Sequence, residues 1–175
     1  MDAYLAVVSK REVRHYAPQP IPNAVLTQIL EAGRASGSSR NRQPWRFIVI
    51  TDRERLAALS AHVYRPGNLT GCAAAIAVVV SGEESLFDAG RCAQNLMLAA
   101  WTLGVGTCPN TPRDLAAVRA ILGVPDGMAI PTILTLGYPA PGEPRPRPKA
   151  DPTRVLARVN RRPLPELLHR ERYSG

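Results

Sequence analysis

The sequence is poor in cysteine and in aromatic residues. Its 175 residues include three Cys, two Phe, two Trp and five Tyr. The cysteines, at positions 72, 92 and 108, are odd in number and form no C-x-x-C pair. Neither a disulfide framework nor a zinc site is therefore indicated, and we expect buried, reduced thiols.

Long hydrophobic runs are also missing. The longest apolar stretch, Cys72 to Val80, has nine residues, too few to cross a bilayer. Residues 1–8 show neither a basic segment ahead of an apolar core nor a small-residue cleavage site, the marks of a secretory signal. These absences predict a soluble, cytoplasmic protein with no membrane partner.

Several enzyme classes lack their sequence patterns. The three histidines, His15, His62 and His169, have no metal-ligand spacing such as H-x-x-x-H. No G-x-S-x-G element, no P-loop and no strand-linked G-x-G-x-x-G occurs. Metal-dependent hydrolysis and acyl transfer are therefore not indicated, and no metal site is expected.

Positive charge is abundant, with a formal net charge of +8. Nine Lys or Arg lie between Arg145 and Arg172, against Asp151, Glu166 and Glu171. A basic tail could bind nucleic acid through phosphates, but no aromatic residues are interleaved to stack on bases. We favour a solvated basic face with one or two arginines recruited for an anionic ligand. Salt-dependent nucleic-acid binding remains the alternative.

Periodicity and capping residues predict helices and strands in comparable number without a βαβ rhythm, so the fold class is α+β. Asn23 and Thr111 are candidate N-caps, the latter followed by Pro112 at the first helical position. We expect a single domain over 1–175, with 139–175 as a Pro- and Arg-rich arm. The expected helices are 2–10, 23–36, 52–63, 85–103 and 111–122, and the expected strands are 47–50, 76–80 and 133–136.

One helix has an apolar segment on every side. From Leu96 to Trp101 no residue is polar, and a helix that is apolar all round is buried on all faces. A domain this small buries such a helix most easily at a subunit interface. Pro139 to Pro152, with six prolines, predicts an extended arm suited to wrapping a partner.

Two polar clusters could carry chemistry. Arg11 and Arg14 are three residues apart, so both guanidinium groups can reach one ligand, and forked donors suit a phosphate. The stretch 36–45, SGSSRNRQPW, gathers hydroxyls, amides and turn residues directly before a strand. Together they suit a phosphorylated planar heterocycle with donors and acceptors along its rim.

These clusters, in this order and spacing, resemble the FMN-dependent nitroreductase family, which has R-S-x-R-x-F/Y first and P-S-x-x-N-x-Q-P-W second. The segments 88–100, DAGRCAQNLMLAA, and 103–107, LGVGT, resemble its central helix, and 161–169, RRPLPELLH, resembles its terminus. The resemblance implies a central, mainly antiparallel sheet flanked by helices, built as an intertwined homodimer.

The resemblance also implies roles for individual residues. Arg11 and Arg162 would hold the FMN phosphate, and Arg14 would stabilise the pyrimidine end of the reduced ring. The backbone after the central helix would pass the N5 edge. The other implied cofactor-binding residues are Ser38, Ser39, Asn41 and Gln43 from the neighbouring subunit, and Thr107, Cys108 and Pro109.

Three positions need comment. Glu12 stands where the family usually has a small polar residue, and a carboxylate beside a phosphate is unfavourable unless it turns onto Arg11 or Arg14. Gly37 replaces the usual proline. Asn68 is a further candidate for the N3/O4 edge of the ring.

The function implied is an oxidoreductase in which hydride passes from NADH or NADPH through FMN to a nitroaromatic, a quinone or an activated alkene in one pocket. Arg40 and Arg42, inside the second motif, predict a preference for anionic partners such as NADPH. The alternatives are an offshoot with other flavin chemistry, such as reductive dehalogenation or flavin breakdown, and a non-catalytic flavin-binding protein.

Overall fold

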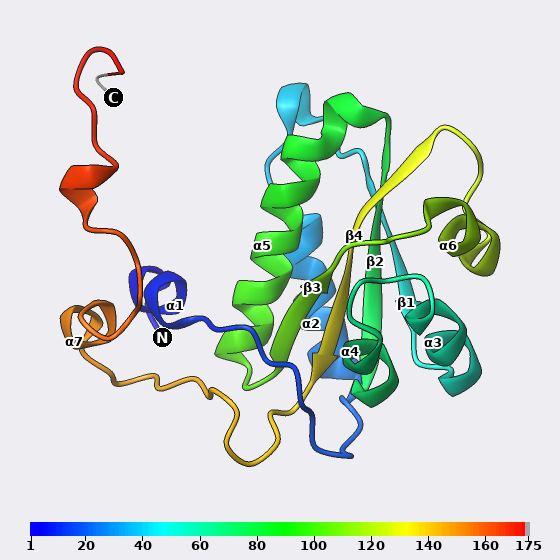
Figure 1. Cartoon of the computed structure of the whole chain (residues 1–175), viewed down its shortest axis with the longest axis horizontal. Helices are drawn as coiled ribbons and strands as arrows, with labels where there is room; N and C mark the ends of the chain where they lie inside the picture. Colours follow the sequence, from blue (N-terminus) through cyan, green and yellow to red (C-terminus); the bar gives the residue numbers. More distant parts are fainter. Residues whose placement is uncertain (174–175) are drawn as a thin grey trace.

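The computed structural model describes residues 1–173 and forms a three-layer α+β arrangement (Figure 1). Four strands make one sheet: β1 (Trp45–Ile50), β2 (Ala74–Ser81), β3 (Gly106–Asn110) and β4 (Met128–Gly137). The helices are α1 (Ala3–Ser9), α2 (Asn23–Arg34), α3 (Arg53–Ser60), α4 (Pro66–Gly71), α5 (Leu86–Thr102), α6 (Leu115–Leu122) and α7 (Pro152–Leu156). Short 3-10 turns are η1 (Ser39–Asn41), η2 (Glu83–Ser85) and η3 (Leu164–Glu166).

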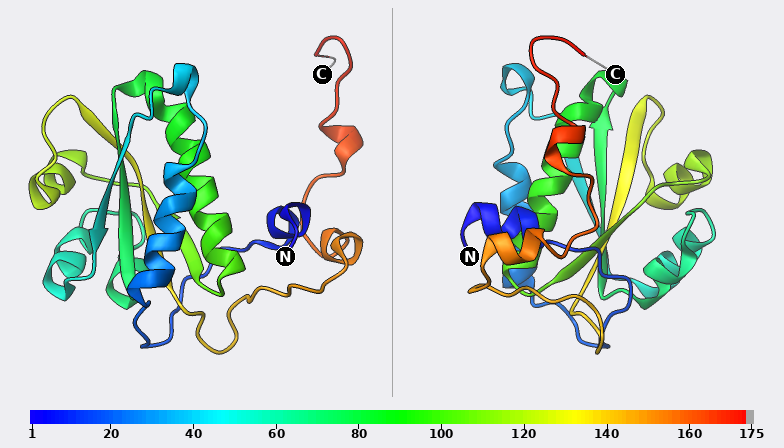
Figure 2. Two further views of the ribbon diagram at one scale, coloured as in Figure 1. Left: turned by 180° about the vertical axis from the view of Figure 1, so that it is seen from behind. Right: turned by 60° about the vertical axis from the view of Figure 1, so that its left-hand side comes forward.

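The sheet has the strand order β1-β2-β4-β3, and all three neighbouring pairs are antiparallel. The central strand β2 is apolar on both faces because helices cover both. Ile76 and Val78 belong to the cluster that holds α2 and α5, whereas Ala75 and Ala77 pack with α3 and α6. Strand alternation places these residues on opposite faces, and Figure 2 shows the helices on the two sides.

Local signals placed most elements correctly. Asp2 and Asp52 cap α1 and α3, accepting from the backbone N–H groups of Leu5 and Arg55 at 2.8 and 2.9 Å. The expected strands are the centres of β1, β2 and β4. The α+β class and the antiparallel sheet are thus confirmed.

Two predicted caps are wrong. Asn23 is the first helical residue of α2, whose N-cap is Pro22, and no side chain caps it. The sixth helix begins at Leu115 rather than at Thr111, because the Asp114 carboxylate accepts from the N–H of Ala117 at 3.0 Å. A carboxylate next to the first turn is also favoured by the helix dipole.

The apolar segment of α5 is mostly buried within one chain. Leu96, Met97, Ala100 and Trp101 are buried, whereas Leu98 and Ala99 are half-buried. Among the described residues, no helix is both long and apolar enough to cross a membrane.

The arm leaves the sheet after β4. Residues 141–150 form no helix or strand and lead to α7, which packs on α1 (Figure 1). Beyond α7, the chain to residue 173 extends away from the sheet, as Figure 1 and the left view of Figure 2 show. Three apolar side chains there, Leu164, Leu167 and Leu168, are exposed.

Candidate functional site

The first motif lies along the free edge of β3. Glu12 forms a parallel bridge with Thr107, and the N–H of Val13 donates to the Thr107 carbonyl at 3.0 Å. A Cβ at Gly106 would come within 2.6 Å of the Val13 side chain, so only glycine permits this approach. The structure thereby joins two segments that the sequence assigns separately to one ligand: 11–14 and 107–109.

The Glu12 carboxylate is neutralised by a residue that the sequence analysis passed over. Glu12 Oε1 lies 2.7 Å from Lys10 Nζ, and the Lys10 side chain is only 6% exposed. Glu12 therefore turns onto Lys10 rather than onto Arg11 or Arg14, the two partners that the sequence analysis considered. The buried Lys10 ammonium lies against the carboxylate and offsets much of the repulsion that a bare carboxylate would exert on a phosphate.

The two arginines of the motif differ in surroundings. Arg11 Nη1 donates to the carbonyls of Val8 and Lys10 at 2.9 and 2.8 Å, at the end of α1. Arg14 has an exposed side chain, and its backbone N–H donates to Glu143 Oε2 at 3.2 Å. Both cations therefore stay near one segment, with Arg14 the freer to reach a ligand.

A buried hydrogen-bond network supports β3 from behind. Asn68 Nδ2, from α4, donates to Asn110 Oδ1 at 2.8 Å and approaches Cys108 Sγ at 3.5 Å. Asn110 Nδ2 in turn donates to the Cys108 carbonyl at 3.0 Å. Thr135 Oγ1 donates to the same carbonyl at 3.1 Å and lies 2.8 Å from the Tyr16 hydroxyl. These amides and hydroxyls hold the β3 backbone in place.

The Cys108 thiol is neutral. Burial raises its pKa above the usual thiol value, and the Glu12 carboxylate adds to that effect, while Arg14 and Lys10 act in the opposite direction. A neutral thiol is a poor nucleophile and metal ligand. Among the side chains that the structure describes, no cluster of three or more His, Cys, Asp or Glu suited to a metal occurs.

Two buried oxygens in this region have no hydrogen-bond partner: Glu12 Oε2 and Thr107 Oγ1. Buried polar atoms are normally paired, so an unpaired carboxylate oxygen and hydroxyl at one junction need an explanation. FMN offers hydroxyl donors on its ribityl chain, a phosphate for Arg11 and a ring edge for Arg14. The residues present therefore fit an FMN molecule.

Pro109 contributes differently from its neighbours. It is exposed on the edge strand β3, opposite Leu134 of β4, and has no N–H. Of the three predicted positions on this strand, only Thr107 and Cys108 therefore carry a backbone donor.

The second motif forms a tight, self-supported loop. Ser38 Oγ accepts from the N–H of Gln43 at 2.8 Å, and the N–H of Ser39 donates to the buried Asp88 at 3.1 Å. Arg40, Asn41 and Gln43 have φ values of 51, 55 and 49°, in the left-handed region. Such backbone is uncommon for residues other than glycine and is held here by the surrounding bonds.

The two motifs lie at opposite ends of α5. Asp88, near the start of α5, holds the second motif, whereas Trp101, near its end, donates to Ser9 Oγ beside the first. At about 1.5 Å of rise per residue, Asp88 and Trp101 are roughly 20 Å apart.

One chain thus assembles only part of the predicted set. The first motif and β3 come together, with Arg11, Glu12, Arg14, Thr107, Cys108 and Pro109 in one region. Ser38, Ser39, Asn41 and Gln43 do not join them. Arg162 lies on the extended arm, where it pairs with Glu166 at 3.1 Å.

Sequence reasoning missed Lys10, Asn110 and Thr135. Lys10 is next to the motif in the sequence, but only its contact with Glu12 in the structure shows that it neutralises that carboxylate. Asn110 and Thr135 are single polar residues in or beside apolar segments, and nothing local reveals that they bond to one another at 3.4 Å. Asn68, a candidate from the sequence, does lie at this region.

Comparison with known proteins agrees with the geometry. The model of the nitroreductase family matches residues 7–70 and 72–138. A protein of Archaeoglobus fulgidus, provisionally named NADH dehydrogenase/NAD(P)H nitroreductase, is 31% identical over 145 residues, covering 76% of this chain and 83% of the relative. The chain belongs to the nitroreductase family.

Solved structures show the same fold. A provisionally named NADH dehydrogenase/NAD(P)H nitroreductase from Bacteroides thetaiotaomicron is 25% identical with a TM-score of 0.80, over 99% of both chains. A provisionally named nitroreductase from Desulfovibrio desulfuricans, crystallised in complex with FMN, is 26% identical with a TM-score of 0.77, again over 99% of both chains.

Proposed function

We propose that this protein is an FMN-dependent oxidoreductase that passes hydride from NADH or NADPH to an electron-poor acceptor. The observation that carries the proposal is the junction of the first motif with β3, where Arg11 and Arg14 flank Glu12 and two buried oxygens, Glu12 Oε2 and Thr107 Oγ1, have no partner. The relatives named as NAD(P)H nitroreductases and the relative crystallised with FMN support it.

The site takes residues from two subunits. Because about 20 Å of α5 separates the two motifs in one chain, a second chain is needed to bring a Ser38–Gln43 loop to the first motif. The exposed Leu164, Leu167 and Leu168 of the arm, and the exposed Tyr4 and Val7 of α1, are apolar surfaces that a partner would cover. In such a dimer we assign Arg162 of the extended arm to the FMN phosphate. We therefore propose an intertwined homodimer with two such sites.

The protein residues supply placement and charge. FMN, when bound, supplies the hydride-accepting ring. Arg11 and Arg162 anchor its phosphate by forked hydrogen bonds. Arg14 places a fixed cation near the pyrimidine edge, where negative charge develops on reduction. The β3 backbone at Thr107 and Cys108 borders the ring edge, while Ser39, Asn41 and Gln43 of the second subunit close over it.

The acceptor shares the pocket with the nicotinamide. Nitroaromatics, quinones and activated alkenes are planar and electron-poor, so they suit a site that offers stacking and no acid or base of its own. Arg40 and Arg42, both exposed in the second motif, favour NADPH over NADH because they add positive charge near the pocket mouth.

An absorption spectrum of the purified protein, before and after addition of FMN, tests cofactor binding. A flavin band and FMN-dependent oxidation of NAD(P)H with menadione or nitrofurazone are expected. Protein that stays colourless with excess FMN would refute the proposal. Tight FMN binding without NAD(P)H oxidation would refute the enzymatic part and identify a flavin-binding protein.

The predicted nicotinamide preference has its own test. Arg40→Ala is expected to raise KM for NADPH several-fold and to leave KM for NADH unchanged, because only NADPH carries the extra phosphate. Equal rates with the two nucleotides, unaffected by Arg40→Ala, would contradict the preference but not the flavin chemistry.

A further inference from the structure

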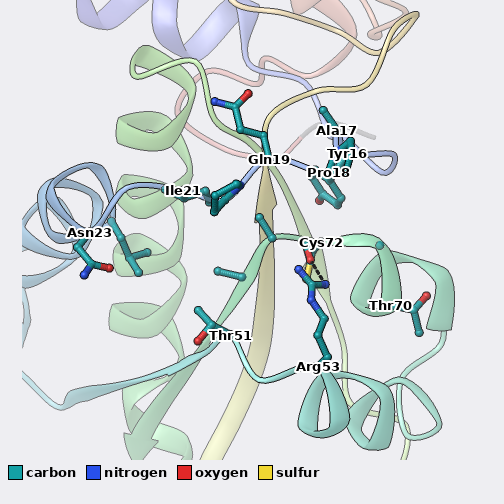
Figure 3. Close-up of a pocket in the computed structure, with 15 residues that line it drawn as sticks. Tyr16, Ala17, Pro18, Gln19, Ile21, Asn23, Thr51, Arg53, Thr70 and Cys72 are labelled. Carbon is teal, nitrogen blue, oxygen red and sulfur yellow. Dashed lines mark hydrogen bonds between the residues drawn. The ribbon is translucent and has the colours of Figure 1, made fainter.

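A cavity lies at the opposite end of the sheet from η1. It has a volume of about 600 Å³ and is lined by the connector Tyr16–Ile21, the residues after β1, the start of β2 and the helices α2 and α4 (Figure 3). None of the predicted cofactor-binding residues lines it. The volume falls within the range of small-molecule pockets.

The lining combines apolar walls with a single charge. Pro18, Pro20, Ile21, Leu26 and Ala74 supply the apolar surface, and Arg53 is the only charged residue among those that line the cavity. No carboxylate of the protein lines it to compensate that charge. An anionic group on a ligand is therefore the missing complement.

Arg53 is oriented by a bond to the backbone. Its Nη1 donates to the Cys72 carbonyl at 2.6 Å, and Figure 3 shows it reaching from the start of α3 toward Cys72, with Thr51 and Thr70 on either side. Within residues 1–173 it forms no ion pair. A guanidinium has five N–H groups, so donors remain for a planar carboxylate.

The far wall of the cavity is rigid. A Cβ at Gly137 would lie 2.6 Å from the Tyr16 ring, so the ring has little room to move. The Tyr16 hydroxyl is held by the Val13 carbonyl at 2.7 Å. Prolines at 18 and 20 stiffen the rim. A pocket formed in advance binds without the entropic penalty of ordering its walls.

We propose that this cavity is a binding site for a small carboxylate with an apolar or aromatic body, with Arg53 pairing the carboxylate. The site is separate from the flavin region, and the proposal holds whether or not the proposed oxidoreductase activity does. Thr51 and Thr70 add hydroxyls beside the guanidinium, and Ile21 and Leu26 contact the apolar body.

Benzoate and its neutral isostere benzamide are suitable probes, titrated into FMN-supplemented, isotopically labelled protein by NMR. Benzoate should give saturable amide shifts at Thr70 and Gly71 with a Kd of about 1 mM. Benzamide should bind at least about tenfold more weakly, because it cannot form the charged pair.

Substitution at Arg53 completes the test. Arg53→Gln should weaken benzoate at least about tenfold, and Arg53→Lys, which keeps the charge but not the fork, by less. Arg55→Gln, on the same helix, exposed and outside the cavity, is the matched control and should change nothing. If Arg53→Gln fails to fold, the difference in affinity between benzoate and benzamide in the unsubstituted protein still tests whether the site requires a carboxylate.

Three results would overturn the proposal. The first is no saturable shift up to about 20 mM benzoate, well above the expected Kd. The second is shifts confined to residues 107–110, which would place benzoate in the flavin region. The third is equal binding by the Arg53→Gln and Arg55→Gln variants.

Discussion

The two ends of α5 hold the two motifs in different physical states. Near Trp101, the first motif is tied to β3 by backbone bonds, and buried amides back the strand. Near Asp88, the second motif is a surface loop with three residues in left-handed backbone and exposed Ser39, Asn41 and Gln43 side chains. The first end is anchored inside its own chain, whereas the second presents its groups outward.

This difference between the two ends of α5 suggests how one helix can contribute to two sites. A buried hydrogen-bond network fixes the geometry of its residues but leaves few side chains free to bind a ligand. An exposed loop leaves its side chains free to bind but fixes them less firmly. If each site in a dimer combines one anchored end with one outward loop, every helix contributes to both sites.

The largest effect is expected from mixing subunits. Arg14→Ala and the double variant Ser39→Ala/Asn41→Ala should each lower FMN affinity at least about tenfold, through lost hydrogen bonds to the ligand. When the two variant proteins are unfolded and refolded together, some dimers contain one chain of each variant. One of the two sites in such a dimer combines two intact motifs, so about half of the sites in the mixed dimers should bind FMN tightly again. Binding is measured by quenching of flavin fluorescence. No restoration would place both motifs in one subunit's site.

Removing the buried amide at the first end should be the next most damaging change. Asn110→Ala leaves the Asn68 amide without its oxygen acceptor and removes one of the two side-chain donors to the Cys108 carbonyl, which costs about 2–3 kcal/mol of unfolding free energy. Ser39→Ala, at the exposed end, should stay within about 0.5 kcal/mol. Urea unfolding measures the loss of unfolding free energy in both variants. Comparable losses would contradict the contrast between a buried first end and an exposed second end of α5.

Relieving left-handed backbone should affect only the second end. Arg40→Gly removes a Cβ from a residue with φ of 51°, so it should stabilise the fold by up to about 1 kcal/mol, less the entropy of a freer unfolded chain. Arg42→Gly, at φ of −66°, is the control and should destabilise slightly. Thermal unfolding distinguishes them, and equal shifts would argue against strain in the loop.

The smallest effect concerns Glu143, whose carboxylate joins the arm to Arg14 and His15 of the first motif; we call this contact the acidic latch. Burial opposes ionisation of Glu143, but hydrogen bonds from the His15 ring and from the Arg14 and His15 backbone outweigh it and hold its pKa below the usual value. A lowered folded-state pKa stabilises the fold above the unfolded pKa, and this stability is lost as pH falls through the folded value.

Glu143→Gln should therefore lower stability at neutral pH and bring the variant closer to the unsubstituted protein as the medium becomes acidic. Parallel melting curves at several pH values measure this convergence. A constant difference between the two proteins at every pH would show that the carboxylate charge plays no part in the latch.

Much of the fold could be predicted from the sequence because its signals are local. The apolar run of β2 and the aspartates before α1 and α3 act within a few residues. Strand β3 was missed because Gly106, Pro109 and Asn110 are poor strand formers, and pairing with β4 overrides their preference. Pro66 opens α4 although the surrounding residues read as a turn.

The candidate site was predictable where its residues are adjacent in sequence, and less so where they are not. The motif around Arg11 and Arg14 and the segment around Cys108 were each identified. The pairing of Glu12 with Lys10 depends on side-chain burial, and the Asn68–Asn110 bond joins residues far apart along the chain. Long-range contacts of this kind leave no periodic pattern.

The placement of Glu12 and Val13 along β3 has one more consequence. An unprotected outer strand of a sheet can recruit strands from other molecules and so begin aggregation. Here the segment of the first motif covers that border, with the Val13 N–H bonded to the Thr107 carbonyl and Pro109 lacking an N–H. If this segment holds FMN as we propose, cofactor binding and protection from self-association depend on the same few residues, and flavin loss and precipitation should occur together.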